Sequence, residues 1–226
     1  MTEKDQILAR IREALRVPAP LPGDHAGGVH AHSEPPQNSR QWLPAVGESF
    51  GERLALFQKN ASDLKAEFHL VDNLGDGCNV ILRIKEAEGW QCIGSHTGEL
   101  TDRVCTSLGL PICRTDKPYD VAELERCDAG ITECDALIAQ TGSVLVTSRS
   151  AGGRALSVLP PHHVVLARRE QLLADLQDGF ELLQQKYNSG YPSFMSFITG
   201  PSRTGDIERV LVLGAHGPKK LTILCF

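Results

Sequence analysis

The sequence predicts an α/β fold: a mixed, largely parallel sheet flanked by helices, preceded by an N-terminal helical arm. Between residues 48 and 114, amphipathic helical segments alternate with short apolar segments of strand length. Strands that alternate with helices at this spacing form βαβ units, in which parallel strands are covered by helices. Nearer the C-terminus, short β-branched segments bounded by glycine are typical of buried strands.

The N-terminal part is expected to be a helix followed by a linker. Apolar residues recur on one face of residues 2–16, which predicts an amphipathic helix. Residues 17–46 are rich in Pro, Gly, His and Ser and have no apolar period, so they predict a linker. The domain division is therefore an arm and linker over 1–46 and an α/β domain over 47–226. The helix could dock on a partner or pack on its own domain, and the sequence leaves both open.

Three histidines lie in this linker, namely His25, His30 and His32. Histidines in a flexible segment without cysteines or buried carboxylates are usually solvated rather than bound to a metal. No metal site is therefore predicted in the chain.

The first half of the α/β domain should follow a strand–helix alternation. A helix over 48–67 and a helix that ends at Gly89 and contains Val80, Ile81 and Ile84 are expected, with a third helix over 98–108. The intervening strands are expected at residues 69–71, 90–93 and 110–114.

The second half should supply the remaining strands. Residues 143–148 and 164–167 are the clearest strands, 129–132 suggests a short one, and 136–139 fits either a strand or a helical turn. A helix is expected over 170–186, with Leu172, Leu173, Leu176, Phe180 and Leu183 on one face. Buried strands are expected at 197–198 and 210–213, and a terminal strand at 220–226.

Composition limits the function. A net charge of −5 and an aromatic content of 5% argue against nucleic acid as a partner, because that needs a basic surface and stacking rings. No segment has the apolar length of a membrane span, and the charged N-terminus lacks a signal-peptide core. The seven cysteines contain no C-x-x-C pair, which favours a cytoplasmic location and cysteines used as buried hydrophobic residues. The closely spaced cysteines of an iron–sulfur site are absent from the sequence.

Three loops next to predicted strands share one composition. Residues 140–143, 200–204 and 214–218 combine glycine with polar or cationic side chains. Glycine lets backbone approach a ligand, and hydroxyl and guanidinium groups donate to anions. We expect the loops, with the Gly-Gly-Arg turn at 152–154, to form a pocket for a small carboxylate or phosphate. The residues expected to bind are Gln140, Gly142, Ser143, Gly153, Arg154, Ser202, Arg203, Thr204, Gly214, His216 and Gly217.

Each prominent side chain has a structural alternative. Arg203 either binds the anion or pairs with Asp206 or Glu208, and the sequence favours neither. His216 is the one candidate for acid–base catalysis, although a histidine in such a loop more often fixes a turn. The adjacent His162 and His163 are expected at edge positions, with one ring half buried.

Several common site patterns do not occur. The chain has no G-x-S-x-G motif, which argues against a serine hydrolase. It also lacks G-x-G-x-x-G and the P-loop, so NAD or ATP binding in the usual form is not expected.

The segments 141–148, 200–208 and 213–218 together resemble the lactate-utilisation protein C family (LutC/YkgG), built on the LUD domain. The resemblance runs over 47–226 and extends to the N-terminal helix and linker. It implies a fold of the NagB/RpiA/CoA-transferase type and a role in oxidising L-lactate to pyruvate. It also implies an iron–sulfur protein and a cysteine-rich protein as partners, with the clusters in those partners and no cofactor in this chain. A homo-oligomer is compatible with these expectations.

The chain departs from this family at Gln140, where the family usually has glutamate. An amide cannot serve as a general base or as an acyl-forming nucleophile. Two alternatives remain beside the lactate-oxidising subunit. One is a stand-alone CoA- or acyl-transferase or sugar-phosphate isomerase on the same fold, and the other is a non-catalytic assembly subunit.

Overall fold

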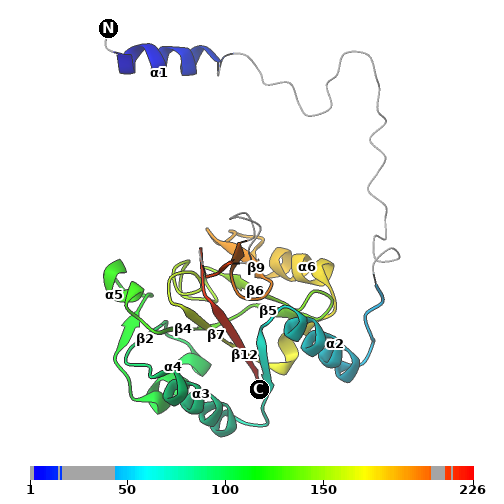
Figure 1. The fold of residues 1–226 in the computed structure, drawn as a ribbon. Helices are drawn as coiled ribbons and strands as arrows, with labels where there is room; N and C mark the ends of the chain where they lie inside the picture. Colours follow the sequence, from blue (N-terminus) through cyan, green and yellow to red (C-terminus); the bar gives the residue numbers. More distant parts are fainter. Residues whose placement is uncertain (1–2, 15, 17–43, 205–211, 215) are drawn as a thin grey trace. The chain divides into compact units, whose positions relative to one another are not determined.

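The computed structural model of the chain (Figure 1) describes residues 3–14, 16, 44–204, 212–214 and 216–226. The chain divides into two units, Met1–Leu43 and Pro44–Phe226. In the first unit the described element is helix α1, Glu3–Ala14, whose Ile7 and Leu8 are exposed. Among the described residues, no helix is both long and apolar enough to cross a membrane.

The second unit is built on a six-stranded sheet in which every paired neighbour is parallel. The strand order is β1-β12-β7-β4-β2-β3. These strands are β1 (Glu67–Leu70), β2 (Ile93–Ser95), β3 (Ile112–Arg114), β4 (Ala129–Glu133), β7 (His162–Ala167) and β12 (Lys220–Cys225). The α/β fold expected from the sequence, with a largely parallel sheet and flanking helices, is confirmed.

One face of this sheet is covered by α3 (Leu74–Glu88) and α4 (Glu99–Leu108). Side chains from β4, β7 and β12 pack there against Ile81, Val104 and Leu108 in one hydrophobic layer. Gly89 and Gly109 end the two helices with positive φ, a conformation that glycine adopts without strain. The predicted ends of both helices are therefore correct.

The other face is covered by α2 (Phe50–Asp63) and by a second, four-stranded sheet. Strand order in this sheet is β8-β5-β6-β9, with β5–β6 and β6–β9 antiparallel. The strands are β5 (Ala136–Ile138), β6 (Ser143–Thr147), β8 (Leu172–Leu173) and β9 (Met195–Ile198). A hydrophobic layer containing Phe57, Leu137, Val146, Val165 and Ile223 joins them to the six-stranded sheet.

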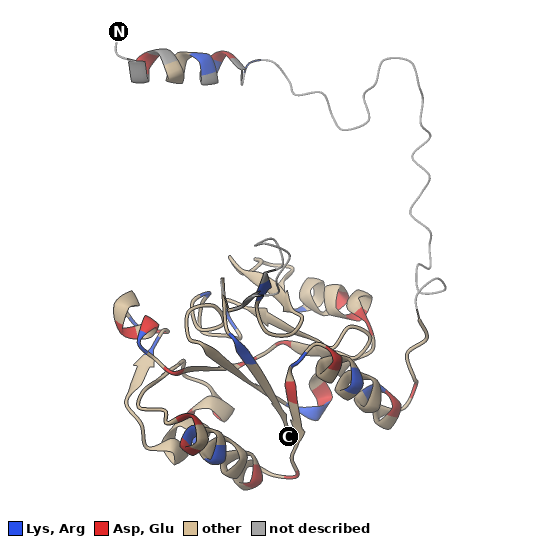
Figure 2. Cartoon of the chain, viewed as in Figure 1, with Lys and Arg blue, Asp and Glu red and all other residues tan. Residues whose placement is uncertain are grey.

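The outer face of the second sheet carries α6, Leu176–Tyr187. Leu183 and Tyr187 of this helix pack on Ala136, Ile138 and Leu145. Viewed by charge, α2 and α3 carry residues of both signs, whereas the central strands are nearly free of charge (Figure 2). The packing is thus four-layered, with the central strands of each sheet buried on both faces.

The single helix expected over 170–186 is wrong at its start. Residues Arg169–Gln171 form a 3-10 turn, and Leu172 and Leu173 form β8, which pairs with β5. Helix α6 begins only after Asp175, whose carboxylate accepts a hydrogen bond from the backbone N–H of Asp178. Leu172 therefore packs in the hydrophobic layer between the two sheets. Phe180, expected on the apolar face of the helix, is exposed.

Other boundaries move by a few residues. Helix α2 ends at Asp63, not Glu67, and Phe68 belongs to β1. The strand expected at 90–93 is β2 at Ile93–Ser95, because Trp90 still bonds back to Lys85 at the end of α3. Residues 136–138 are a strand, which settles the ambiguity left by the sequence.

The last strand, β12, lies inside the six-stranded sheet between β1 and β7. Strand β7 in turn lies between β12 and β4, so its residues are interior. The expectation of His162 and His163 at a sheet edge is therefore wrong: both side chains are buried. Conversely, β9, expected to be buried, is half-buried to exposed.

Ile131 in β4 is fully buried between the sheet and its covering helices. Replacing it with alanine should lower the free energy of unfolding by about 2–5 kcal/mol, because the lost methyl groups leave a cavity. Urea denaturation would measure this. Val121→Ala, at an exposed position in α5 (Val121–Glu125), is the control and should change stability little. Equal stability of the two variants would contradict the assignment of β4 to the core.

Candidate functional site

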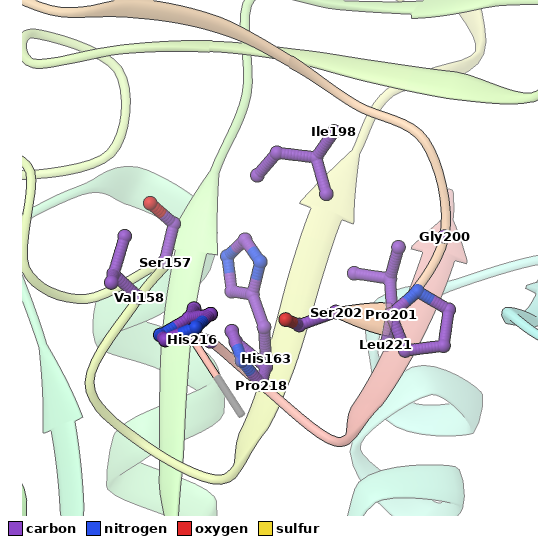
Figure 3. A pocket seen from close by; sticks show the side chains of 11 residues that line it. Ser157, Val158, His163, Ile198, Gly200, Pro201, Ser202, His216, Pro218 and Leu221 are labelled. Atoms are coloured by element: carbon purple, nitrogen blue, oxygen red, sulfur yellow. The ribbon is translucent and has the colours of Figure 1, made fainter. Parts of the chain in front are cut away.

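A cavity of about 130 Å³ opens at the amino ends of β7 and β12, beside the end of β9 (Figure 3). Its walls come from the loop after β9, the loop before β12 and the turn before β7. The lining residues are Ser157, Val158, His163, Ile198, Gly200, Pro201, Ser202, His216, Gly217, Pro218 and Leu221. Two of the three loops singled out in the sequence therefore meet around one cavity.

Backbone hydrogen bonds hold these two loops together. The N–H of Ser202 donates to the carbonyl of Pro218 (2.9 Å), and the N–H of Gly214 donates to the carbonyl of Ser202 (2.9 Å). The short antiparallel strands β10 (Arg203–Thr204) and β11 (Val212–Leu213) continue this pairing. The wall of the cavity is thus a paired backbone structure, which positions its side chains.

Gly200 explains why the first loop can turn so tightly. Its φ is +82°, and a methyl group at this position would come within 2.8 Å of the Leu64 carbonyl oxygen. Only glycine satisfies both the left-handed conformation and the close approach. Gly200 therefore allows this loop to pack closely against the end of α2.

His163 is the polar group buried most deeply in the cavity. Its side chain is 1% exposed and extends toward Ser157, Ile198 and Ser202 (Figure 3). Nε2 lies 2.9 Å from the hydroxyl oxygen of Thr132 on β4. Nδ1 is buried and has no hydrogen-bond partner among the described residues.

Burial, with a smaller electrostatic contribution from the neighbouring His162, lowers the pKa of His163 to about 3. The ring is therefore neutral at physiological pH, and it can donate or accept a hydrogen bond there without carrying charge. A histidine with such a pKa is suited to recognising a ligand rather than to exchanging protons with it near neutrality.

The neighbouring His162 points to the opposite face of the sheet, as alternation along a strand requires. Its Nδ1 lies 3.0 Å from Glu88 Oε2, and its Nε2 lies 2.8 Å from the Thr222 hydroxyl. The ring also packs edge-on against Trp90. Both nitrogens are thus occupied, and His162 has a structural role away from the cavity.

The rim of the cavity holds three of the residues expected from the sequence: Ser202, His216 and Gly217. His216 is exposed, and Ser202 is half-buried. Ser157, which no sequence pattern indicated, lies in the buried part and donates to the Arg154 carbonyl (3.4 Å). The cavity therefore has a polar, accessible mouth and a mostly apolar interior.

The loop at 140–143 does not line the cavity. Asn60 on α2 donates to the carbonyl of Gln140 (2.9 Å), and the Gln140 side chain donates to the carbonyl of Pro44 (3.2 Å). Gly142 has φ +65°, and a methyl group there would come within 2.7 Å of the Ala61 nitrogen. Ser143 bonds to the Thr199 hydroxyl at 2.8 Å. These residues pack the β5–β6 hairpin on α2.

The Gly-Gly-Arg turn also lies elsewhere. A side chain on Gly152 would collide with His96, and the Gly152 carbonyl accepts from the Thr115 hydroxyl at 2.6 Å. Gly153, with φ +115°, has open space where a side chain would be, and Arg154 is exposed. The turn thus covers the carboxyl ends of β2 and β3.

Arg203 and its neighbours flank the cavity without lining it. Arg203 is exposed and follows Ser202 directly, and its backbone pairs with Leu213. The expected alternatives for its charge, pairing with Asp206 or Glu208, lie outside the described residues. Thr204 is paired in β10, and Gly214 bonds to the Ser202 carbonyl.

Within the described residues, no group of three or more His, Cys, Asp or Glu side chains could hold a metal ion. The linker histidines lie outside those residues. Five of the seven cysteines are buried, and burial raises the pKa of Cys105, Cys113, Cys127, Cys134 and Cys225. A raised thiol pKa is typical of inert, packed cysteines.

Comparison with known proteins identifies the family. The model of the LUD domain matches residues 54–225, which is most of the chain. The chain belongs to the LUD domain family. The LUD domain therefore includes both sheets and all walls of the cavity, and the family resemblance noted in the sequence is confirmed.

Similar proteins named lactate utilization protein C match about half of this LUD domain chain. The protein from Deinococcus radiodurans is 34% identical over 119 residues, which is 52% of this chain and 55% of that protein. The proteins from Shouchella clausii (35% over 106 residues) and Bacillus subtilis (31% over 119 residues) match 46% and 50% of both chains. The chain thus spans about half the length of the curated relatives it matches.

A solved structure shows the same fold. The crystal structure of a DUF162 family protein from Deinococcus radiodurans superimposes with a TM-score of 0.61 at 22% identity. The match covers 79% of this chain and 99% of that chain. At this identity the likeness shows the fold of the LUD domain alone.

The central side chains of the LUD-domain cavity were not found by sequence reasoning. His163 and Leu221, which line the cavity, and Thr132, which bonds to His163 behind it, all lie within strands, and their meeting depends on the order β12-β7-β4. Alternation along β7 could have placed the two histidines on opposite faces. Which face holds a cavity depends on the second sheet, and no local pattern shows this.

His163 should make the stability of the LUD domain pH-dependent. An unfolded histidine titrates near pH 6.5, about 3.5 units above the folded value of about 3. Between these values the unfolded chain binds more protons, so the free energy of unfolding should fall as pH is lowered from 6.5. The loss approaches about 1.4 kcal/mol per pH unit once the unfolded histidine is fully protonated.

Urea denaturation of the wild type and of His163→Asn between pH 7 and 4.5 would measure this effect. The variant should lose less stability over that range, because asparagine does not titrate. Glu88, whose pKa is lowered from 4.5 to about 2, contributes only at lower pH, where its stabilisation is lost. Parallel curves for the two proteins would contradict a neutral, buried His163.

Proposed function

We propose that this chain is a subunit of an L-lactate utilisation system. The observation that carries the proposal is its membership in the LUD domain family together with matches to several proteins named lactate utilization protein C. In this proposal, lactate is oxidised to pyruvate with iron–sulfur and cysteine-rich partner proteins holding the redox centres. This LUD domain contributes a small-molecule site.

The cavity supports a small carboxylate as the ligand of that site. A cavity of about 150 Å³ in another protein holds benzene, and the cavity here measures about 130 Å³. Lactate and pyruvate have as many non-hydrogen atoms as benzene. Ser202 and His216 at the mouth and the exposed Arg203 beside it supply donors or positive charge for a carboxylate.

An acyl- or CoA-transferase is less well supported. That chemistry needs a carboxylate nucleophile, and among the described residues no Asp or Glu lines the cavity. Gln140, at the position where the family usually has glutamate, is bonded to Pro44 and Asn60 away from the cavity. The cavity of this LUD domain is also far smaller than the pockets of several hundred Å³ that hold drug-sized molecules.

Growth on L-lactate as sole carbon source tests the proposal in a host whose own gene for this chain is deleted. Deletion should abolish growth on lactate but not on glucose, and the intact gene should restore it. Ile198→Trp, which fills the cavity from β9, should fail to restore it although the variant, somewhat destabilised by the added bulk, still shows a cooperative thermal transition. Unimpaired growth after deletion would contradict the function, and full rescue by Ile198→Trp would favour a non-catalytic assembly subunit.

Arg203→Ala should weaken binding of L-lactate or pyruvate about two- to fivefold, because an exposed charge near the cavity mouth contributes modestly to anion binding. Isothermal calorimetry at low salt would measure the change. Lactamide, which is uncharged, should bind both proteins equally. Arg154→Ala, also exposed, is the matched control and should bind like the wild type. An equal loss in both arginine variants would contradict a specific role for Arg203.

A further inference from the structure

One buried polar atom in the cavity has no partner. Nδ1 of His163 is buried in a side chain that is 1% exposed, and no described residue bonds to it. Buried polar atoms in folded proteins are almost always hydrogen-bonded, because an unpaired one costs the full loss of its hydration. The ring projects into the cavity, where a ligand could supply the missing partner (Figure 3).

Thr132 determines which kind of partner is missing. Its side chain is fully buried, and in the described part of the chain its hydroxyl bonds only to Nε2 of His163, at 2.9 Å. A hydroxyl can donate only one proton, and here Nε2 is the acceptor available to it. The neutral ring then carries its own proton on Nδ1. Nδ1–H is therefore a donor without a partner among the described residues, in a ring that lines the cavity.

We propose that the cavity binds a short 2-oxo monocarboxylate and that His163 recognises its carbonyl oxygen through the Nδ1–H donor. This inference rests on the proposed function, which supplies a three-carbon acid as ligand. It goes further by assigning the 2-oxo acid, the product of lactate oxidation, as the preferred ligand. It also assigns His163 as the residue that determines this preference.

The distribution of polar and apolar groups orients the ligand. The interior beside His163 is formed by Leu221, Ile198 and the uncharged Ser157, and His163 itself is neutral. A carboxylate placed there would be a buried charge without a counter-charge, which is strongly unfavourable. The carboxylate therefore lies at the mouth with Ser202 and His216, and the uncharged carbonyl oxygen and the methyl group enter the interior.

A 2-hydroxy acid fits the same space less well. Its hydroxyl oxygen can accept from Nδ1–H, but its own proton then needs an acceptor, and in the described interior only the Ser157 hydroxyl, which already donates to the Arg154 carbonyl, offers one. Sites built around a donor lose affinity for a ligand that leaves a polar group poorly paired. We expect pyruvate to bind at least about fivefold more tightly than L-lactate.

Isothermal calorimetry with pyruvate and L-lactate tests the predicted preference for pyruvate. It uses the full-length wild type and two variants whose replacing side chains are similar in shape. His163→Asn places an amide N–H at the position of Nδ1, whereas His163→Leu places a methyl group there. Pyruvate should bind the wild type more tightly than lactate does, bind the Asn variant within a few-fold, and bind the Leu variant at least about tenfold more weakly. Equal or tighter binding of lactate, or equal losses in both variants, would overturn the proposal.

Long-range ¹H–¹⁵N spectra of histidine-labelled protein provide a second readout that does not depend on affinity. His163 should show a protonated Nδ1, and pyruvate should shift this resonance while leaving that of His162 in place. A proton on Nε2 would overturn the proposal. If neither acid binds, yet deletion still abolishes growth on lactate, the proposed function stands and this inference fails.

Discussion

The burial of β7 on both faces is the constraint on which the rest of the structure depends. All six of its residues are buried, because β4 and β12 pair with its edges and helices or a second sheet cover its faces. Two adjacent histidines in such a strand must enter different layers. His162 meets Glu88 and Thr222 in one layer, whereas His163 meets Thr132 and an open cavity in the other.

Asp135, next to β5 of the second sheet, is a buried polar side chain that is charged rather than neutral. The Asp135 side chain is 0% exposed, and it accepts from Lys186 Nζ and the Tyr187 hydroxyl at 2.7 Å each. Burial alone would raise its pKa, but the hydrogen bonds of Lys186, Ser150 and Tyr187 outweigh burial and lower it. Asp135 is therefore charged and paired, whereas His163 is neutral and has no counter-charge among the described residues. This contrast explains why the cavity interior suits an uncharged group.

The sequence predicted the fold class well and the site only in part. Helix ends at Gly89 and Gly109 were predictable because glycine stops a helix locally. The loops around Ser202 and His216 were recognised by composition, since both must approach other backbone closely. Gln140 lies in a loop of the same glycine-rich, polar composition but packs on α2. His163 lies in a strand, outside any such loop, and yet lines the cavity. Their positions depend on strand order and on the second sheet, which are long-range properties.

Beside β4, the carboxyl end of the sheet is occupied by the chain's own side chains. Ligands of open α/β sheets usually lie beyond the carboxyl ends of the strands, often at a helix N-terminus. Here Glu133, at the end of β4, occupies that position itself by accepting from the N–H groups of Leu100 (2.9 Å) and Thr101 (3.3 Å) at the start of α4. Gly152 closes over His96 beside it. At the amino ends of β7 and β12 the cavity presents the neutral His163 ring rather than a helix N-terminus, so we expect this site to select by hydrogen-bond type more than by charge.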